Sequence, residues 1–259
     1  MGDGDERPIP PLSRKDILTM AVTFPNESPA YRAARNDLLE REIALRREIA
    51  AVAAQRSQLP RGGVVPAGYI FEGRDPAGMP SQIPMFDLFE PGKDTLLVYS
   101  FMFAPEMEHP CPGCTGLIDS VGRAFEYLRD RINVVAVADA PLSRIVDIAD
   151  WRGWFGLPML STAGNSYNRD YHGVHPDGYP LPMVNVFRKV DGTIHHFWGA
   201  EMLYAPTDPG QDSRSNDTWD PVWNLLDLTP EGRGTDWDAV IDFEATYPPV
   251  LVPANQAQR

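Results

Sequence analysis

The chain has 259 residues, of which 43% are hydrophobic, and a formal net charge of −13 from 23 Lys and Arg against 36 Asp and Glu. This composition suffices for a globular domain with its own core, and the negative charge would repel nucleic acid and anionic membranes. No apolar run approaches the roughly 18 residues of a membrane helix, and the acidic N-terminus lacks the apolar centre of a signal peptide. The sequence therefore predicts a soluble, cytoplasmic protein with neither a nucleic-acid nor a membrane partner.

The first predicted element is a long helix that begins at Ser28-Pro29 and runs to about Arg56. Serine is a favoured N-cap residue, and proline is tolerated in the first helical turn. Helical spacing places an apolar stripe on one face, formed by Tyr31, Ala34, Leu38, Leu45, Ile49 and Val52. Such a helix is too long for the inside of a compact α/β sandwich. The stripe is therefore either an internal packing face or the contact between two copies in a homodimer.

Residues 60–94 are rich in glycine and proline and are expected to form turns around one short strand at 69–71. Residues 95–103 are almost continuously apolar, which is typical of a central strand covered on both faces. The spacing of apolar residues from Leu117 onward predicts a helix to about Asp130, and 132–138 is a second buried strand.

Pro141 is expected to open a helix that ends near Trp151, followed by a short strand at 159–161 and one helical turn at 167–171. The segments 183–188 and 193–198 read as two strands joined by Asp191-Gly192, a strong hairpin signal. Residues 200–259 are loop-rich. Their expected anchors in the core are Trp219, Trp223, Leu225, Leu226, Leu228, Trp237 and Phe243.

The order strand, helix, strand, helix, hairpin predicts a parallel right-handed βαβ unit extended by antiparallel strands. This is an α/β, thioredoxin-like mixed sheet flanked by helices. The expected organisation is an N-terminal arm and long helix over 1–64, a thioredoxin-like domain over 65–200, and a C-terminal extension over 201–259 packed on that domain.

The two cysteines of the chain lie in the motif Cys111-Pro112-Gly113-Cys114, between the first long strand and the helix that follows it. Unpaired N–H groups and the positive end of the helix dipole would favour a thiolate at Cys111, whereas Cys114 would lie shielded one turn further on. We therefore expect Cys111 to attack a substrate disulfide and Cys114 to resolve the mixed disulfide. Pro112 is tolerated there because the first turn needs no N–H, and Gly113 leaves the sulfurs accessible.

Two further residues are candidates for supporting roles. His109 would stabilise the thiolate when protonated, although Glu106 and Glu108 would oppose it. Pro182 immediately precedes the first hairpin strand, and we expect a cis bond from Leu181 that places it beside the motif. The alternative for Pro182 is that it merely begins a strand.

A Cys-x-x-Cys motif also occurs in metal sites, which normally need two further ligands. The chain has no second such motif, and the side chains of His195 and His196 would point to opposite faces of a strand. We therefore predict neither a metal nor a cofactor, with a structurally inert cysteine pair as the remaining alternative. The polar cluster at 167–170 either lines the groove beside the motif or forms a capped helical turn.

The sequence also resembles a bacterial thioredoxin-like family of unknown function whose members are described as predicted dithiol–disulfide oxidoreductases. The segments that carry the resemblance are Val98–Pro105, Cys111–Cys114, Tyr69–Gly73, Ala140–Leu142, Tyr167–Gly173 and Leu226–Arg233. The resemblance spans about residues 30–240 and implies a thioredoxin fold with Cys111 and Cys114 as the dithiol. Residues 58–63 depart from the family pattern, being more glycine-rich.

Together these features predict a thiol–disulfide oxidoreductase that reduces or exchanges disulfides of a protein or a small molecule, with an unidentified electron donor. One alternative is a thiol peroxidase of peroxiredoxin-like type, in which Cys111 becomes a sulfenic acid that Cys114 captures. Another is a non-catalytic protein-binding module on a thioredoxin scaffold.

Overall fold

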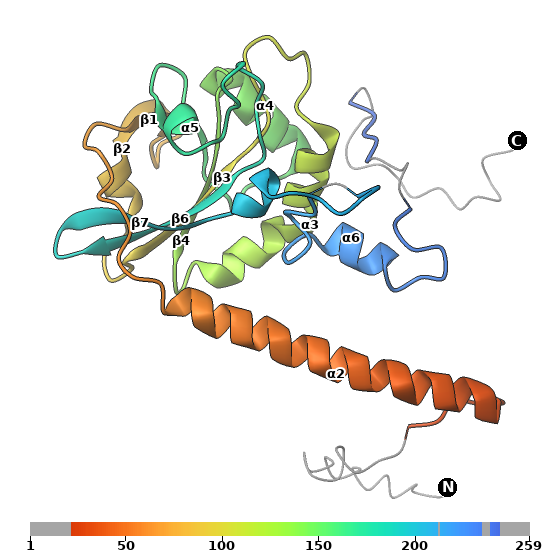
Figure 1. Ribbon diagram of the computed structural model, residues 1–259. Helices are drawn as coiled ribbons and strands as arrows, with labels where there is room; N and C mark the ends of the chain where they lie inside the picture. Colours follow the sequence, from red (N-terminus) through yellow and green to blue (C-terminus); the bar gives the residue numbers. More distant parts are fainter. Residues whose placement is uncertain (1–21, 212, 235–238, 244–259) are drawn as a thin grey trace, which may run out of the picture. The chain divides into compact units, whose positions relative to one another are not determined.

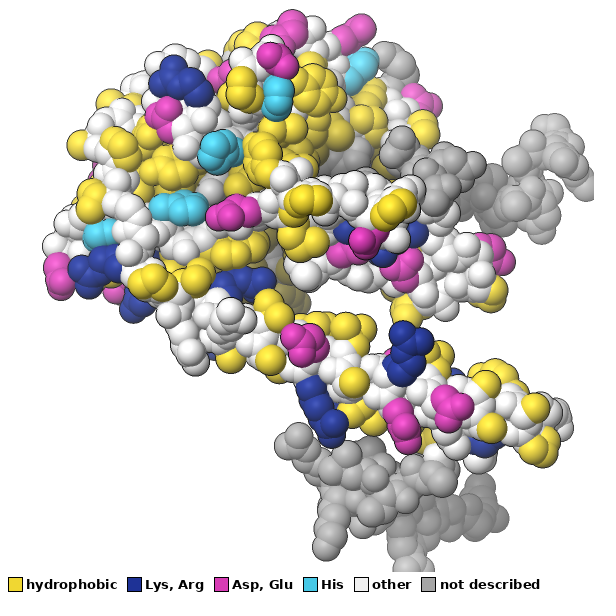
Figure 2. All heavy atoms as spheres, viewed as in Figure 1, with side chains coloured by type: hydrophobic (Ala, Val, Ile, Leu, Met, Phe, Trp, Pro, Cys, Tyr) yellow, Lys and Arg dark blue, Asp and Glu magenta, His cyan; other side chains and the backbone are white. Residues whose placement is uncertain are grey.

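The computed structural model describes residues 22–211, 213–234 and 239–243, and the chain divides into two compact units after Gln58. The first unit contains helix α2, Pro29–Ser57, which confirms the predicted helix. The hydroxyl oxygen of Ser28 accepts the N–H of Tyr31 at 3.1 Å and so caps the helix. No residue of α2 is buried, and Figure 2 shows apolar side chains interspersed with charged ones along its length.

The second unit is built on one seven-stranded mixed sheet with the strand order β2-β1-β5-β4-β3-β6-β7 (Figure 1). The strands are β1 Ile70–Arg74, β2 Pro80–Pro84, β3 Thr95–Ser100, β4 Asn133–Ala138, β5 Met159–Ser161, β6 Val184–Val190 and β7 Thr193–Gly199. The α-helices are α3 Pro112–Leu128, α4 Leu142–Arg152, α5 Tyr167–Asp170 and α6 Pro221–Leu226, with 3₁₀ turns η1 Met85–Leu88 and η2 Glu201–Tyr204.

The centre of the sheet has the predicted connectivity. Strands β3 and β4 are parallel and are connected through α3, whereas β6 pairs antiparallel with β3 and β7 pairs antiparallel with β6. The order β4-β3-β6-β7 with this helix crossover is the thioredoxin arrangement. The predicted thioredoxin-like α/β fold is therefore confirmed.

The sheet is covered on both faces, and successive residues of β4 show why. Val134, Ala136 and Ala138 join a hydrophobic cluster with side chains of α3 and α4, including Leu117 and Ile145. The residues between them, Val135 and Val137, join a second cluster on the other face with Phe71 and Tyr167. Alternation along a strand sends consecutive side chains to opposite faces, so a strand buried on both sides reads as a continuous apolar run.

The predicted first long strand was too long, because β3 ends at Ser100 rather than at residue 103. Residues 101–104 leave the strand but stay buried, and the N–H of Phe101 donates to the carbonyl of Val137 at 2.7 Å. Burial, rather than strand pairing, therefore accounts for the end of the apolar run. Strand β2 was not predicted: it lies at the sheet edge and has prolines at both ends, Pro80 and Pro84, which read as turn signals.

The hairpin is confirmed, and its turn has the expected backbone, because Asp191 and Gly192 both have positive φ, at 51° and 76°.

The C-terminal extension contains α6, which was not predicted. Two of its expected anchors are wrong, since Leu225 is 62% exposed and Leu228 is 81% exposed. Trp219 does pack, edge-on against Tyr99 at 5.3 Å between ring centroids, and Trp237 lies outside the described residues. None of the helices in the described part of the chain is both long and apolar enough to cross a membrane.

Candidate active site

The cysteine motif forms the N-terminus of α3. Cys111 is the N-cap residue, with φ −58° and ψ 126°, and Pro112 occupies the first helical position. The Cys111 sulfur accepts the N–H of Cys114 at 3.5 Å, so it takes the place that a serine or aspartate oxygen takes at other helix starts. A negatively charged sulfur would strengthen this hydrogen bond and meet the positive end of the helix dipole.

The two thiols differ in environment. Both are free, but Cys111 is half-buried whereas Cys114 is buried, with 4% of its surface exposed. Burial, followed by the contact with Cys111, raises the pKa of Cys114 well above the ordinary value of a thiol. Cys114 therefore keeps its proton at neutral pH, while Cys111 is the sulfur that a reagent can reach.

Tyr99 on β3 lies beside Cys114 in the same core. Its phenol oxygen is buried and has no hydrogen-bond partner of good geometry. Burial, and then the nearby Cys114, raises the pKa of Tyr99 well above its usual range, so the phenol stays neutral. The sequence analysis did not single out Tyr99, although a tyrosine that follows three aliphatic residues in a buried strand is a signal, because its hydroxyl needs a partner in the core.

Cys111 and Cys114 line a cavity of about 230 Å³, together with Gly113 and Pro182. The predicted motif residues and Pro182 thus lie together, and a cis bond at Pro182 stays a prediction. His109 does not line this cavity but stacks on the ring of Phe243, with ring centroids 4.7 Å apart. Residues 167–170 form the helical turn α5 rather than a wall of the cysteine cavity.

The opposite wall of the cavity comes from the C-terminal extension, which sequence reasoning did not connect with the site. Its lining residues are Ser213, Arg214, Ser215, Asn216, Asp217, Asp220, Trp223 and Arg233. Asp220 is 4% exposed, and burial is the main cause that raises its pKa above that of an ordinary aspartate. One of its oxygens accepts the N–H of Val222 at 2.9 Å and thereby caps α6.

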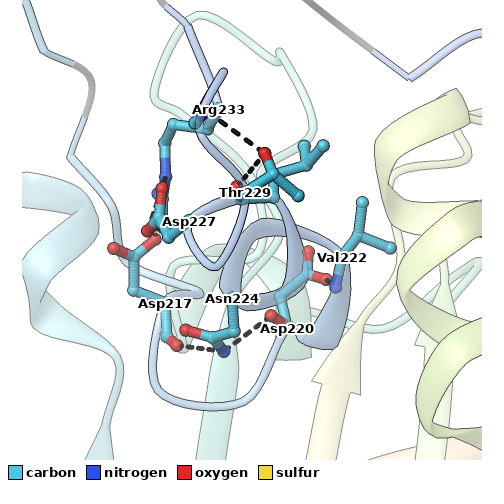
Figure 3. A network of polar contacts seen from close by, with 9 residues as sticks. Asp217, Asp220, Val222, Asn224, Asp227, Thr229 and Arg233 are labelled. Carbon is cyan, nitrogen blue, oxygen red and sulfur yellow. Dashed lines mark hydrogen bonds and ion pairs between the residues drawn. The ribbon is translucent and has the colours of Figure 1, made fainter. Parts of the chain in front are cut away.

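A network of polar contacts holds this wall together (Figure 3). The guanidinium of Arg233 contacts Asp217 at 2.7 Å and Asp227 at 2.5 Å. The side-chain amide of Asn224 donates to the backbone carbonyls of Asp217 and Asp220, both at 2.8 Å. We call residues 213–233 with these contacts the C-terminal clasp.

A larger cavity, of about 850 Å³, lies elsewhere in the second unit and contains no cysteine. His196 on β7 and Asn185 on β6 line it, and the ring Nε2 of His196 lies 2.9 Å from the amide oxygen of Asn185. Burial lowers the pKa of His196 below its ordinary value. Among the described residues, no group of three or more His, Cys, Asp or Glu side chains is arranged to hold a metal ion.

The sequence matches, over residues 21–247, the family described as "Bacterial protein of unknown function (DUF899)". The chain belongs to this family. The match covers the cysteine motif, the hairpin and the C-terminal clasp. No curated protein matches the chain significantly.

Several of the solved structures to which this chain is similar are peroxiredoxins. Reduced 2-Cys peroxiredoxin from Plasmodium vivax is 16% identical, with 52% of this chain and 81% of that one covered and a TM-score of 0.39. Peroxidoxin BcpB from Mycobacterium tuberculosis is 16% identical, with 65% and 99% covered and a TM-score of 0.38. Thioredoxin peroxidase I from Plasmodium yoelii is 16% identical, with 65% and 91% covered and a TM-score of 0.40. The strand order of the sheet and the helix between β3 and β4 define the thioredoxin-like fold.

Proposed function

We propose that the protein is a thiol–disulfide oxidoreductase whose working dithiol is Cys111 and Cys114. The observation that carries this proposal is the division between the two thiols: Cys111 caps α3 beside a cavity, and Cys114 is buried one turn further along the helix. Reactive cysteines occupy partly exposed helix N-termini, whereas buried structural cysteines are inert. Two cysteines without a redox role would not need to differ in burial in this way.

The reaction has two exchange steps. The Cys111 thiolate attacks one sulfur of a substrate disulfide, which forms a mixed disulfide and releases the first substrate half as a thiolate. Cys114 then attacks the Cys111 sulfur, and its proton passes to the departing second half. The substrate gains two electrons, and the protein is left with a Cys111–Cys114 disulfide. A separate dithiol donor must reduce that disulfide before the next cycle.

The test is a redox titration of the pair against mixtures of reduced and oxidised dithiothreitol, with the Cys111–Cys114 disulfide measured by mass spectrometry after acid quenching. We expect one reversible two-electron transition. A Cys114→Ser variant should stop at a mixed disulfide on Cys111, and a Cys111→Ser variant should form none. A pair that shows no defined couple would instead support the non-catalytic binding module.

The peroxidase alternative has its own readout. Hydrogen peroxide would oxidise Cys111 of the Cys114→Ser variant to a sulfenic acid and release water. Dimedone labels the sulfenic acid. Labelling at a rate well above that of a free thiol, together with no turnover of disulfides, would replace the oxidoreductase proposal by the peroxidase.

A further inference from the structure

Two hydrogen-bond donors lie beside the sulfur of Cys114. Tyr99 on β3 is 2% exposed and belongs to the same hydrophobic cluster as Cys114. Its hydroxyl lies close enough to the Cys114 sulfur to act on it as a donor, and the backbone N–H of Met102 acts in the same direction. Burial, and then Cys111, raises the pKa of Cys114, whereas these two donors lower it. The sulfur that makes the second attack therefore has neighbours that favour its negatively charged form.

The hydroxyl of Tyr99 is unused in the resting protein. Its oxygen is buried and has no hydrogen-bond partner of good geometry. A neutral thiol such as that of Cys114 is only a weak acceptor. Because native proteins rarely leave a buried polar atom unpaired, an unpaired phenol beside a reacting sulfur needs an explanation. A hydrogen bond that forms only when charge develops on the sulfur provides one, since interactions of that kind accelerate a reaction.

The surroundings of Tyr99 hold its proton and its ring in place. Burial, followed by Cys114, Cys111 and the carboxyl group of Asp220, raises the pKa of Tyr99 well above its usual range. The ring packs edge-on against Trp219 of the clasp, with ring centroids 5.3 Å apart. The phenol is therefore a positioned donor that can share its hydrogen with an anion without losing it.

We propose that Tyr99 is a catalytic residue of the second exchange step, in which its hydroxyl donates a hydrogen bond to the sulfur of Cys114 as that sulfur attacks Cys111. This inference rests on the proposed function. In this step the Cys114–Cys111 bond forms, the bond between Cys111 and the second substrate half breaks, and the proton of Cys114 passes to that half. Tyr99 keeps its own proton, so atoms and electrons balance. The hydrogen bond is stronger to a charged sulfur than to a thiol and so stabilises the transition state more than the resting state.

The experiment separates the two exchange steps with one equivalent of 2,2′-dithiodipyridine. Attack by Cys111 releases one molecule of thiopyridone, and attack by Cys114 on the mixed disulfide releases a second, so stopped-flow absorbance shows two phases. Tyr99→Phe keeps the ring against Trp219 and removes only the hydroxyl. We expect the second phase of this variant to be slower by about tenfold, since a hydrogen bond to a charged group contributes about that factor. The first phase should be unchanged, because Cys111 makes that attack.

Tyr167→Phe is the matched control. Tyr167 is 0% exposed, its hydroxyl also lacks a hydrogen-bond partner, and its ring lies in the cluster on the other face of the sheet. Thermal unfolding should show similar stability for the two variants, because neither gives up a hydrogen bond of the resting protein. Only Tyr99→Phe should slow the second phase. In that variant the second phase should also accelerate over a higher pH range, because the Cys114 thiolate has lost a donor and the pKa of Cys114 rises.

Equal second-phase rates in Tyr99→Phe and the unmodified protein would overturn this inference and leave the oxidoreductase in place. Equal slowing in Tyr99→Phe and Tyr167→Phe, or of both phases in Tyr99→Phe, would also overturn it, because the cause would then be a general disturbance of the core. If the unmodified protein released no second thiopyridone and formed no Cys111–Cys114 disulfide, the proposed function itself would be refuted.

Discussion

At the scale of single residues, the proposed chemistry depends on two thiols of the same type in unlike surroundings. We predict that Cys111 is alkylated faster than Cys114 by iodoacetamide at neutral pH, by on the order of tenfold or more, because burial holds Cys114 in its unreactive protonated form. Brief treatment followed by peptide mass spectrometry measures both sites. In denaturant the difference should vanish, which is the control. Equal labelling of the folded protein would contradict the assignment of Cys111 as the nucleophile.

His196 should make the stability of the protein depend on pH. Burial lowers the pKa of His196 in the folded protein. As the pH falls below about 6.5, His196 therefore becomes protonated in the unfolded chain while it is still neutral in the folded protein. The free energy of unfolding should therefore fall as the pH drops through that value. Urea unfolding at about pH 7.5 and about pH 5.5 should show a smaller loss for His196→Gln than for the unmodified protein. If the free energy of unfolding of His196→Gln depended on pH as it does in the unmodified protein, the prediction would be wrong.

At the scale of elements, the chain just before β1 is held tightly against β7. The N–H of His196 donates to the carbonyl of Gly63 at 2.9 Å, and a Cβ on Gly62 would lie 2.1 Å from the carbonyl oxygen of His196. We predict that Gly62→Ala destabilises the protein by about 1–3 kcal/mol. The new methyl group would clash with the backbone carbonyl of His196, which cannot move away as a flexible side chain could. Gly63→Ala meets nothing within 4 Å and should change stability by roughly 0.5 kcal/mol or less. Thermal and urea unfolding of the two variants test this, and equal effects would show that the contact does not matter.

Some elements of the fold could be predicted from the sequence, and others could not. The cap at Ser28, the motif at the start of α3 and the turn at Asp191-Gly192 depend on neighbouring residues, so local signals predicted them. Strand β2 and α6 depend on pairing and packing with distant segments, and their prolines resemble loop signals. The candidate site divides in the same way. From the sequence we predicted that Cys111, Cys114 and Pro182 belong to the site. The clasp residues are far from them in the sequence, and only the tertiary fold brings them to the same cavity.

At the scale of the whole molecule, the first unit contains an apolar stripe along α2, in which no residue is buried. Tyr31, Leu38, Leu45 and Val52 recur every seven residues, the spacing of helices that pair, and each is 43–60% exposed. We predict a homodimer in which α2 contacts a second copy of this helix. Changing both Leu38 and Leu45 to glutamate should give monomers that keep the redox couple of Cys111 and Cys114. Light scattering at micromolar concentration measures this, and a monomeric unmodified protein would show that the stripe packs within its own chain.

The division of the cavity between two stretches of sequence has a consequence for how the protein could change. The sulfurs belong to the first helix crossover of the sheet, and the wall that faces them belongs to residues 213–233. Under the proposed function, substitutions in the wall would alter which molecule reacts with the cysteines, while the hydrogen bond between Cys111 and Cys114 at the start of α3 stays in place. Randomising Asn216 and Trp223 in a mutant library is a direct route to new selectivity.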